Sequence, residues 1–124
     1  MMLILLQMAT MAFADEPAAL SLSVDYTAAG EAATFQMDGV PGSTVWLLGG
    51  MESVSLTPTR GCTDITMGVL PNRRIRLTAD ADGSATVDGN LPALLAGNTL
   101  YVQALAFDAA ASSCVVSEVV SLTL

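Results

Sequence analysis

The sequence predicts an all-β protein, a two-sheet antiparallel sandwich of about seven to nine short strands. Three observations lead to this prediction. After Pro17, apolar and polar residues alternate repeatedly, which is the period of a strand with one buried face. Glycine, proline or asparagine interrupts the alternation at short intervals, as turns do. The chain has 124 residues, 52% of them hydrophobic, which suffices for the core of one domain.

The first half of the chain contains four predicted strands. The first places leucine, valine and tyrosine on one face and serine and aspartate on the other, and the second alternates in the same way. The third, STVWLLGG, is almost continuously apolar, which is typical of a central strand. The fourth, SVSLT, alternates again through its valine and leucine. These strands are expected at residues 19–26, 33–38, 43–50 and 53–57.

The second half contains five more predicted strands. DITMGVL and SATVDG are short and alternate through isoleucine, methionine and valine, and through alanine and valine, respectively. Between them, RRIRLTA carries arginines between its apolar residues. The last two are long and close the sandwich. They are expected at residues 64–70, 73–79, 84–89, 99–108 and 115–124, with a single helical turn at 91–97, LPALLAG.

The segment 78–90, TADADGSATVDGN, raises the question of a calcium site. Its aspartates, Asp80, Asp82 and Asp88, are the candidate calcium ligands of the chain. An EF-hand loop that began at Asp80 would need Gly at its sixth position and Glu at its twelfth. The sequence has Ala85 and Leu91 there, so the EF-hand pattern is not met, although Asp80, Asp82 and loop carbonyls remain an alternative ion site.

A β-hairpin over residues 74–90 fits the same segment better. With a three-residue loop, Ala81-Asp82-Gly83, the apolar residues of both strands fall on one face. Arg76 would then stand across from Asp88. Gly83 would occupy the left-handed position that a type I turn with a G1 bulge requires, so we expect it to have a positive φ.

The N-terminal residues have the form of a secretory signal peptide. The run from Leu3 to Ala14 is apolar apart from Gln7 and Thr10, and it ends in an A-x-A motif directly before Asp15. It is shorter than the roughly 20 apolar residues that span a bilayer. We therefore expect a signal peptide at 1–14, a single β-sandwich domain at 15–124, and a secreted, cell-surface or periplasmic protein. The alternative is a buried N-terminal strand or helix.

The two cysteines agree with export. Cys62 and Cys114 allow one intramolecular pairing, and a disulfide is the usual outcome in an oxidising compartment. The alternatives are two free thiols or a metal-binding pair. A metal pair is disfavoured because the sequence contains no histidine and no third cysteine.

Charge and composition exclude several functions. The formal net charge is −8, so DNA, RNA and anionic membrane surfaces would be repelled, and no membrane association is expected after leader removal. The sequence has no histidine and no lysine, which rules out Ser-His-Asp, Cys-His, Ser-Lys and Schiff-base chemistry in this chain. We therefore expect a protein that is not an enzyme and has no cofactor, with calcium as the only candidate ion.

Four segments, GVPGSTVWLLGG, TADADGSATVDGNLP, LYVQALAFD and SEVVSLTL, resemble a poorly characterised class of secreted bacterial β-sandwich domains. LLAGNTLYVQA also resembles the approach to the penultimate strand of immunoglobulin-like and fibronectin type III domains. This resemblance implies an immunoglobulin-like sandwich in which Trp46 is the core tryptophan and Tyr101 anchors a corner through its hydroxyl. Strand parity offers an alternative, with Leu100 and Val102 pointing inward instead. Unlike the usual inter-sheet pair, both cysteines follow Trp46.

Two classes of function remain. The first is a non-enzymatic exported module with a structural or adhesive role, which acts through a protein partner or through self-association. The second is an extracellular module that binds carbohydrate or calcium. A flat apolar sheet face or an unpaired strand edge would favour the first, and an exposed aromatic platform would favour the second.

Overall fold

The computed structural model describes residues 20–59, 61–109 and 112–124. The predicted signal peptide at 1–14 lies outside them. The described residues form ten strands and one short 3-10 turn, η2 (Ala93–Leu95). The strands are β2 (Ser21–Tyr26), β3 (Ala32–Asp38), β4 (Thr44–Gly50), β5 (Ser53–Leu56), β6 (Met67–Val69), β7 (Arg73–Thr78), β8 (Ser84–Asn90), β9 (Thr99–Asp108), β10 (Ser113–Val116) and β11 (Val120–Thr123).

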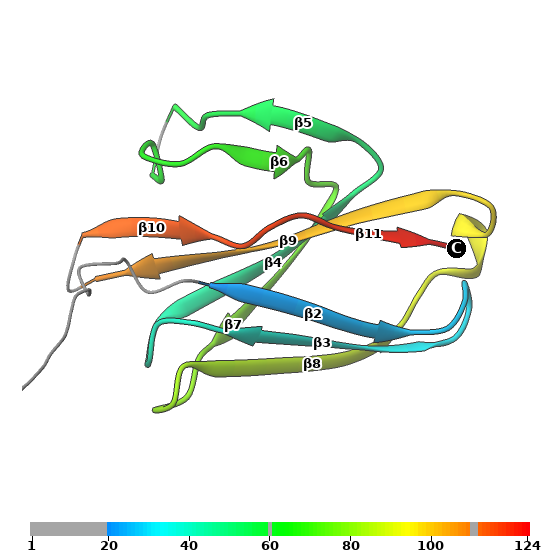
Figure 1. Ribbon diagram of the computed structural model, residues 1–124, viewed down its shortest axis with the longest axis horizontal. Helices are drawn as coiled ribbons and strands as arrows, with labels where there is room; N and C mark the ends of the chain where they lie inside the picture. Colours follow the sequence, from blue (N-terminus) through cyan, green and yellow to red (C-terminus); the bar gives the residue numbers. More distant parts are fainter. Residues whose placement is uncertain (1–19, 60, 110–111) are drawn as a thin grey trace, which may run out of the picture.

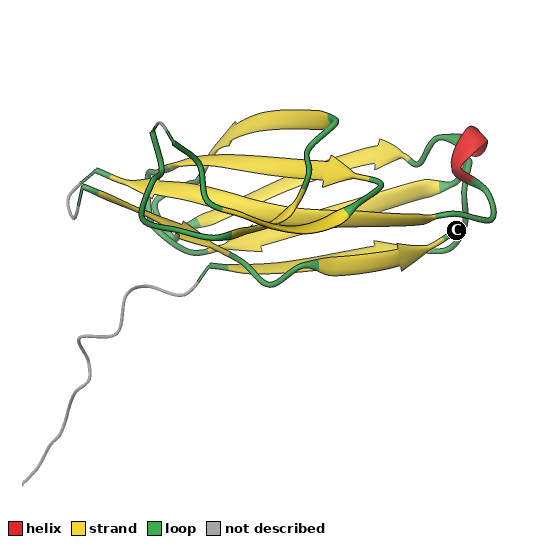
Figure 2. Ribbon diagram, turned by 90° about the horizontal axis from the view of Figure 1, so that it is seen from above, coloured by secondary structure: helices red, strands yellow, loops and turns green. Residues whose placement is uncertain are grey.

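The strands build the predicted antiparallel sandwich (Figures 1 and 2). One sheet has the order β2-β3-β8, and the other has the order β10-β9-β4-β7 with β11 also paired to β9. The expected closing strand at 115–124 is divided into β10 and β11. Their registers against β9 differ by one residue, because the three residues 117–119 lie opposite only two residues of β9, 103–104. At this bulge the Ser117 hydroxyl accepts a hydrogen bond from the Ala104 N–H.

The main core lies between the two sheets and follows the predicted alternation. The inward residues of β3 are Ala33, Phe35 and Met37, as expected, and the side chain of Met37 is fully buried. Strand β4 contributes Val45 and Leu47 from its alternate positions. The core is completed by Leu20, Ala79, Ala85, Leu91, Val102, Ala104, Ala106 and Leu122.

A small third layer covers the outer face of the larger sheet. Strands β5 and β6 pair with each other and lie on the side of that sheet away from β2-β3-β8 (Figure 1). They bury a second set of side chains that does not belong to the main core, namely Leu48, Met67, Val69 and Cys114. This layer was not anticipated, because strand alternation does not reveal to which sheet a hairpin packs.

The predicted hairpin over 74–90 is wrong in its pairing and right in its turn. The loop closes as expected: Gly83 N–H donates to the Asp80 carbonyl at 3.0 Å, and φ of Gly83 is +87°. Beyond the turn, however, β7 pairs with β4 and β8 pairs with β3, in different sheets. Arg76 therefore lies opposite Trp46, and Asp88 lies opposite Thr34.

The two long sides of the sandwich differ. On one side the sheets are tied together, because the Thr123 N–H of β11 donates to the Tyr26 hydroxyl of β2 at 3.1 Å. On the other side β7 and β8 are the edge strands of separate sheets. They start together at the tight turn and then separate, so the sandwich opens along this side (Figure 1).

Candidate inter-sheet cleft

An apolar cleft of about 350 Å³ lies between the separating strands β7 and β8. Phe35 of β3, Leu47 of β4 and Val87 of β8 line it from three different strands. The other lining residues come from β4, β7, β8 and β9, from the loops directly after β4 and before β7, and from the segment around η2: Gly49, Gly50, Met51, Asn72, Arg73, Ile75, Asp88, Gly89, Asn90, Leu91, Pro92, Leu95, Leu100 and Val102.

The lining of the cleft is mainly apolar. Among the described residues that line it, Arg73 and Asp88 are the only ionisable ones, and both are exposed. Ile75 is 41% exposed although it stands at an inward position of β7. The cleft size falls within the usual range of ligand sites, about 300–1,000 Å³. It therefore offers apolar contact and two strand edges, those of β7 and β8, that pair with no further strand in the described part of the chain.

Strand β7 concentrates positive charge in an acidic protein. Its sequence, RRIRLT, holds three of the four basic residues of the chain. The register places Arg74 opposite Leu48 and Arg76 opposite Trp46, so both arginines stand on the outer face of the sheet. Arg73 instead lies on the cleft side. A basic edge strand is thus available at the mouth of an apolar cleft.

The predicted roles of Trp46 and Tyr101 are corrected by strand parity. Val45 and Leu47 occupy the core side of β4, so Trp46 points to the outer face. Val102 lies in the core and Leu100 packs against it, which places Tyr101 on the outer face as well. This confirms the alternative prediction, in which Leu100 and Val102 point inward. A tyrosine anchor does exist, but its hydroxyl belongs to Tyr26.

Trp46 helps to form a second hollow, of about 310 Å³, on the outer face beneath the third layer. Its walls include Leu48 and Leu105 of the sheet. Phe107 lies on the same face and is 46% exposed. The remaining lining residues are Leu56, Pro58, Cys62, Met67, Pro71 and Arg74.

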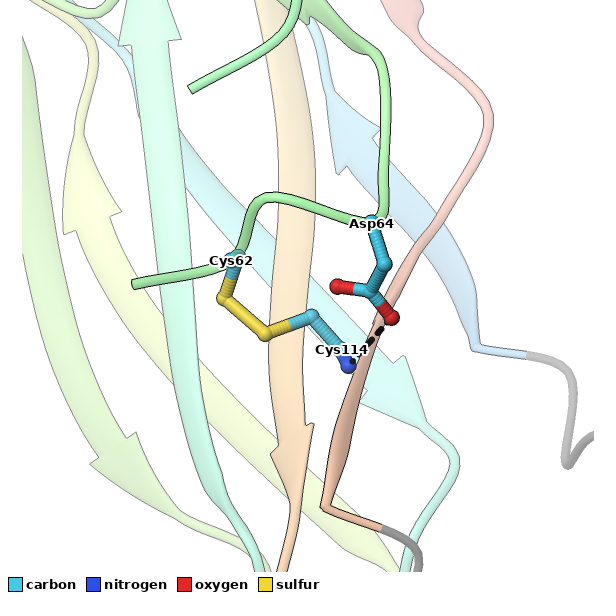
Figure 3. The surroundings of a disulfide bond; sticks show 3 residues. All are labelled: Cys62, Asp64 and Cys114. Carbon is cyan, nitrogen blue, oxygen red and sulfur yellow. Dashed lines mark hydrogen bonds between the residues drawn. A yellow bond between two sulfur atoms is a disulfide. The ribbon is translucent and has the colours of Figure 1, made fainter. Parts of the chain in front are cut away.

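The disulfide between Cys62 and Cys114 is present and fastens the third layer to the sheet. It joins the loop between β5 and β6 to β10, over a sequence separation of 52 residues (Figure 3). Next to it, the Asp64 carboxylate accepts a hydrogen bond from the Cys114 N–H at 3.3 Å. The covalent bond thus holds one wall of the outer hollow in place.

The three candidate calcium ligands do not converge. Asp80 Oδ1 accepts hydrogen bonds from the N–H groups of Asp82 and Ser84, each at 2.9 Å, and so stabilises the turn. Asp88 lies toward the other end of β8, about 13 Å beyond Ser84 at the usual strand rise, and accepts a hydrogen bond from Thr34. Within residues 20–59, 61–109 and 112–124, no group of three or more His, Cys, Asp or Glu side chains could hold a metal ion.

Gln103 is a structural residue that the sequence did not reveal. It is 4% exposed on the outer face of β9. Its Nε2 donates to the Ser117 carbonyl at 2.8 Å, and its Oε1 accepts from the Gly68 N–H at 2.9 Å. A single side chain thereby joins β6, β9 and the bend between β10 and β11. The only available signal was a glutamine inside an otherwise apolar strand.

We expect Gln103→Leu to destabilise the protein by about 2 kcal/mol, because it leaves the part-buried Gly68 N–H and the buried Ser117 carbonyl without their side-chain partner. Chemical denaturation measures the total effect. Hydrogen exchange locates it: the Gly68 amide should lose protection, whereas the Ala104 amide, which is bonded to Ser117, should lose less. Unchanged protection at Gly68 would show that the bridge does not hold β6.

Comparison with known proteins found no match, since no family profile, curated protein sequence or solved structure is significantly similar to the chain. No helix in the described part of the chain has the length and hydrophobicity needed to cross a bilayer.

Proposed function

We propose that the protein is an exported, non-enzymatic β-sandwich module that acts through protein–protein contacts made at the inter-sheet cleft. The observation that carries this proposal is the cleft itself, which is apolar inside and bordered by the edges of β7 and β8, beside which the described residues form no further strand. Apolar surface next to free backbone hydrogen-bonding groups is what a protein segment recognises when it adds to a sheet. Export is supported by the disulfide and by the A-x-A motif at 12–14.

The strand order supports a relation to immunoglobulin-like domains. With β5 and β6 set aside as an insertion, β2-β3-β8 corresponds to strands A-B-E, and β4-β9-β10/β11 corresponds to C-F-G. In the constant-type arrangement a fourth strand, D, lies beside E. Here β7 pairs with β4 instead, so none of the ten described strands covers the edge of β8. The cleft lies at the place where that strand is missing.

A selection from a displayed library of random peptides tests this function. We expect the oxidised protein to enrich peptides whose binding is lost in Ile75→Asp, because a carboxylate at this exposed position places charge at the mouth of the apolar cleft. Leu94→Asp is the matched control, since Leu94 is 93% exposed and does not line the cleft. Failure to enrich any peptide, or equal binding to both variants, would contradict the proposal.

Binding of carbohydrate or calcium remains the alternative function. The half-buried Trp46 and the exposed Phe107 on the outer face favour carbohydrate over calcium, because sugars stack on aromatic rings. Two of the carboxylates predicted to hold calcium have other partners: Asp80 accepts hydrogen bonds within the turn, and Asp88 accepts one from Thr34.

A further inference from the structure

We infer that the cleft binds an extended peptide strand in which apolar and acidic residues alternate, and that this strand adds to the free edge of β7. The inference rests on the proposed function and specifies its partner. The added strand would run antiparallel to β7, as every described strand pair does. It would extend the larger sheet and close the open side of the sandwich.

The apolar half of the pattern follows from two of the three side chains of β7 that face inward, Ile75 and Leu77; the third is Arg73, at the start of the strand. Ile75 lines the cleft and Leu77 packs against the main core, two residues further along the strand. Neighbouring side chains on one face of paired strands lie about 5 Å apart. The inward-facing residues of the added strand, which are every second residue, would therefore line the cleft together with Leu47 and Val87. One of them would lie directly beside Ile75.

The acidic half follows from the residues between them. Arg74 and Arg76 project from the outer face of the same strand and are exposed. The intervening residues of an added strand would stand directly beside them, where opposite charges stabilise and like charges destabilise. A second copy that paired through its own β7 would bring arginines against arginines, so the charge pattern disfavours that arrangement.

Charge also selects β7 over β8 as the edge that is extended. Strand β8 carries Asp88 at the cleft and has no basic residue, so it repels an acidic strand. Its C-terminal residues, Gly89 and Asn90, offer little side-chain contact. The free edge of β7 is six residues long, or about 20 Å, and so fits a peptide of six or seven residues.

The test uses a fluorescein-labelled peptide of seven residues, Val-Glu-Val-Glu-Val-Glu-Val, and fluorescence anisotropy with the oxidised protein. Two control peptides have Lys in place of every Glu, or Pro in place of the Val at position 3, which removes a backbone donor. We expect the Glu peptide to bind at least tenfold more tightly than either control. We expect Ile75→Asp to weaken its binding at least tenfold, and Leu94→Asp to leave it unchanged.

A charge-reversal variant provides the decisive test of the acidic preference. The double variant Arg74→Glu/Arg76→Glu should prefer the Lys peptide, while its melting temperature stays within a few degrees of the parent because both side chains are exposed. Equal binding of Glu and Lys peptides to the parent protein would overturn the inference. Library peptides that bind the cleft without this alternation would overturn it too, yet leave the proposed function standing. A dimer that Ile75→Asp dissociates, with no peptide binding, would identify a second copy as the occupant instead.

Discussion

Removal of the disulfide should cost about 4 kcal/mol of unfolding free energy, the largest effect that we expect from any change to this protein. The Cys62–Cys114 bond closes a loop with a sequence separation of 52 residues, and in the chain-entropy model a loop of this size gives about 4 kcal/mol. The double variant Cys62→Ser/Cys114→Ser should therefore unfold at a markedly lower denaturant concentration. The outer hollow, which Cys62 lines, should also lose its fixed shape in this variant.

Reduction supplies the matching control. Dithiothreitol should lower the stability of the parent protein to that of the double variant and should leave the double variant unchanged. Titration of thiols in the denatured, unreduced parent should find none free. Two results would contradict the disulfide and its role: a parent protein whose stability does not change with dithiothreitol, or one that has two reactive thiols after export.

The replacement Gly83→Ala should cost about 3 kcal/mol, for two separable reasons. A left-handed conformation, with φ of +87°, is unfavourable by about 1–2 kcal/mol for a residue with a side chain. In addition, a Cβ at this position would lie 2.2 Å from the Gly39 carbonyl oxygen, so the backbone must move. The turn would lose its hydrogen bond from the Gly39 N–H to the Gly83 carbonyl, which measures 2.9 Å.

Gly42 separates these two contributions. It has a φ of +70°, but a Cβ there would meet nothing within 4 Å. Gly42→Ala should therefore cost only the conformational part, about 1–2 kcal/mol. Urea denaturation of both variants measures the difference. Equal losses of stability would mean that the contact with Gly39 has no energetic importance.

Much of the local structure was predictable because strand alternation depends only on neighbouring residues. The positions of Phe35 and Met37 in the core, the positive φ of Gly83 and the cysteine pairing all agree with the prediction. Each depends on a short-range rule, namely the two-residue period of a strand, the backbone freedom of glycine, or the presence of only two cysteines.

What the sequence determined by itself was therefore an all-β chain, its strand positions and the buried face of most strands. The tertiary structure alone decided which strands pair. Strands β7 and β8 could lie side by side in one sheet or opposite one another in two sheets. In both arrangements the same residues face the core, namely Leu77, Ala79, Ala85 and Val87, so alternation cannot distinguish the two. The cleft exists because the second arrangement occurs. Its position, the exposed edge of β7 and the outward side of Trp46 follow from long-range pairing, which no local pattern of residues encodes.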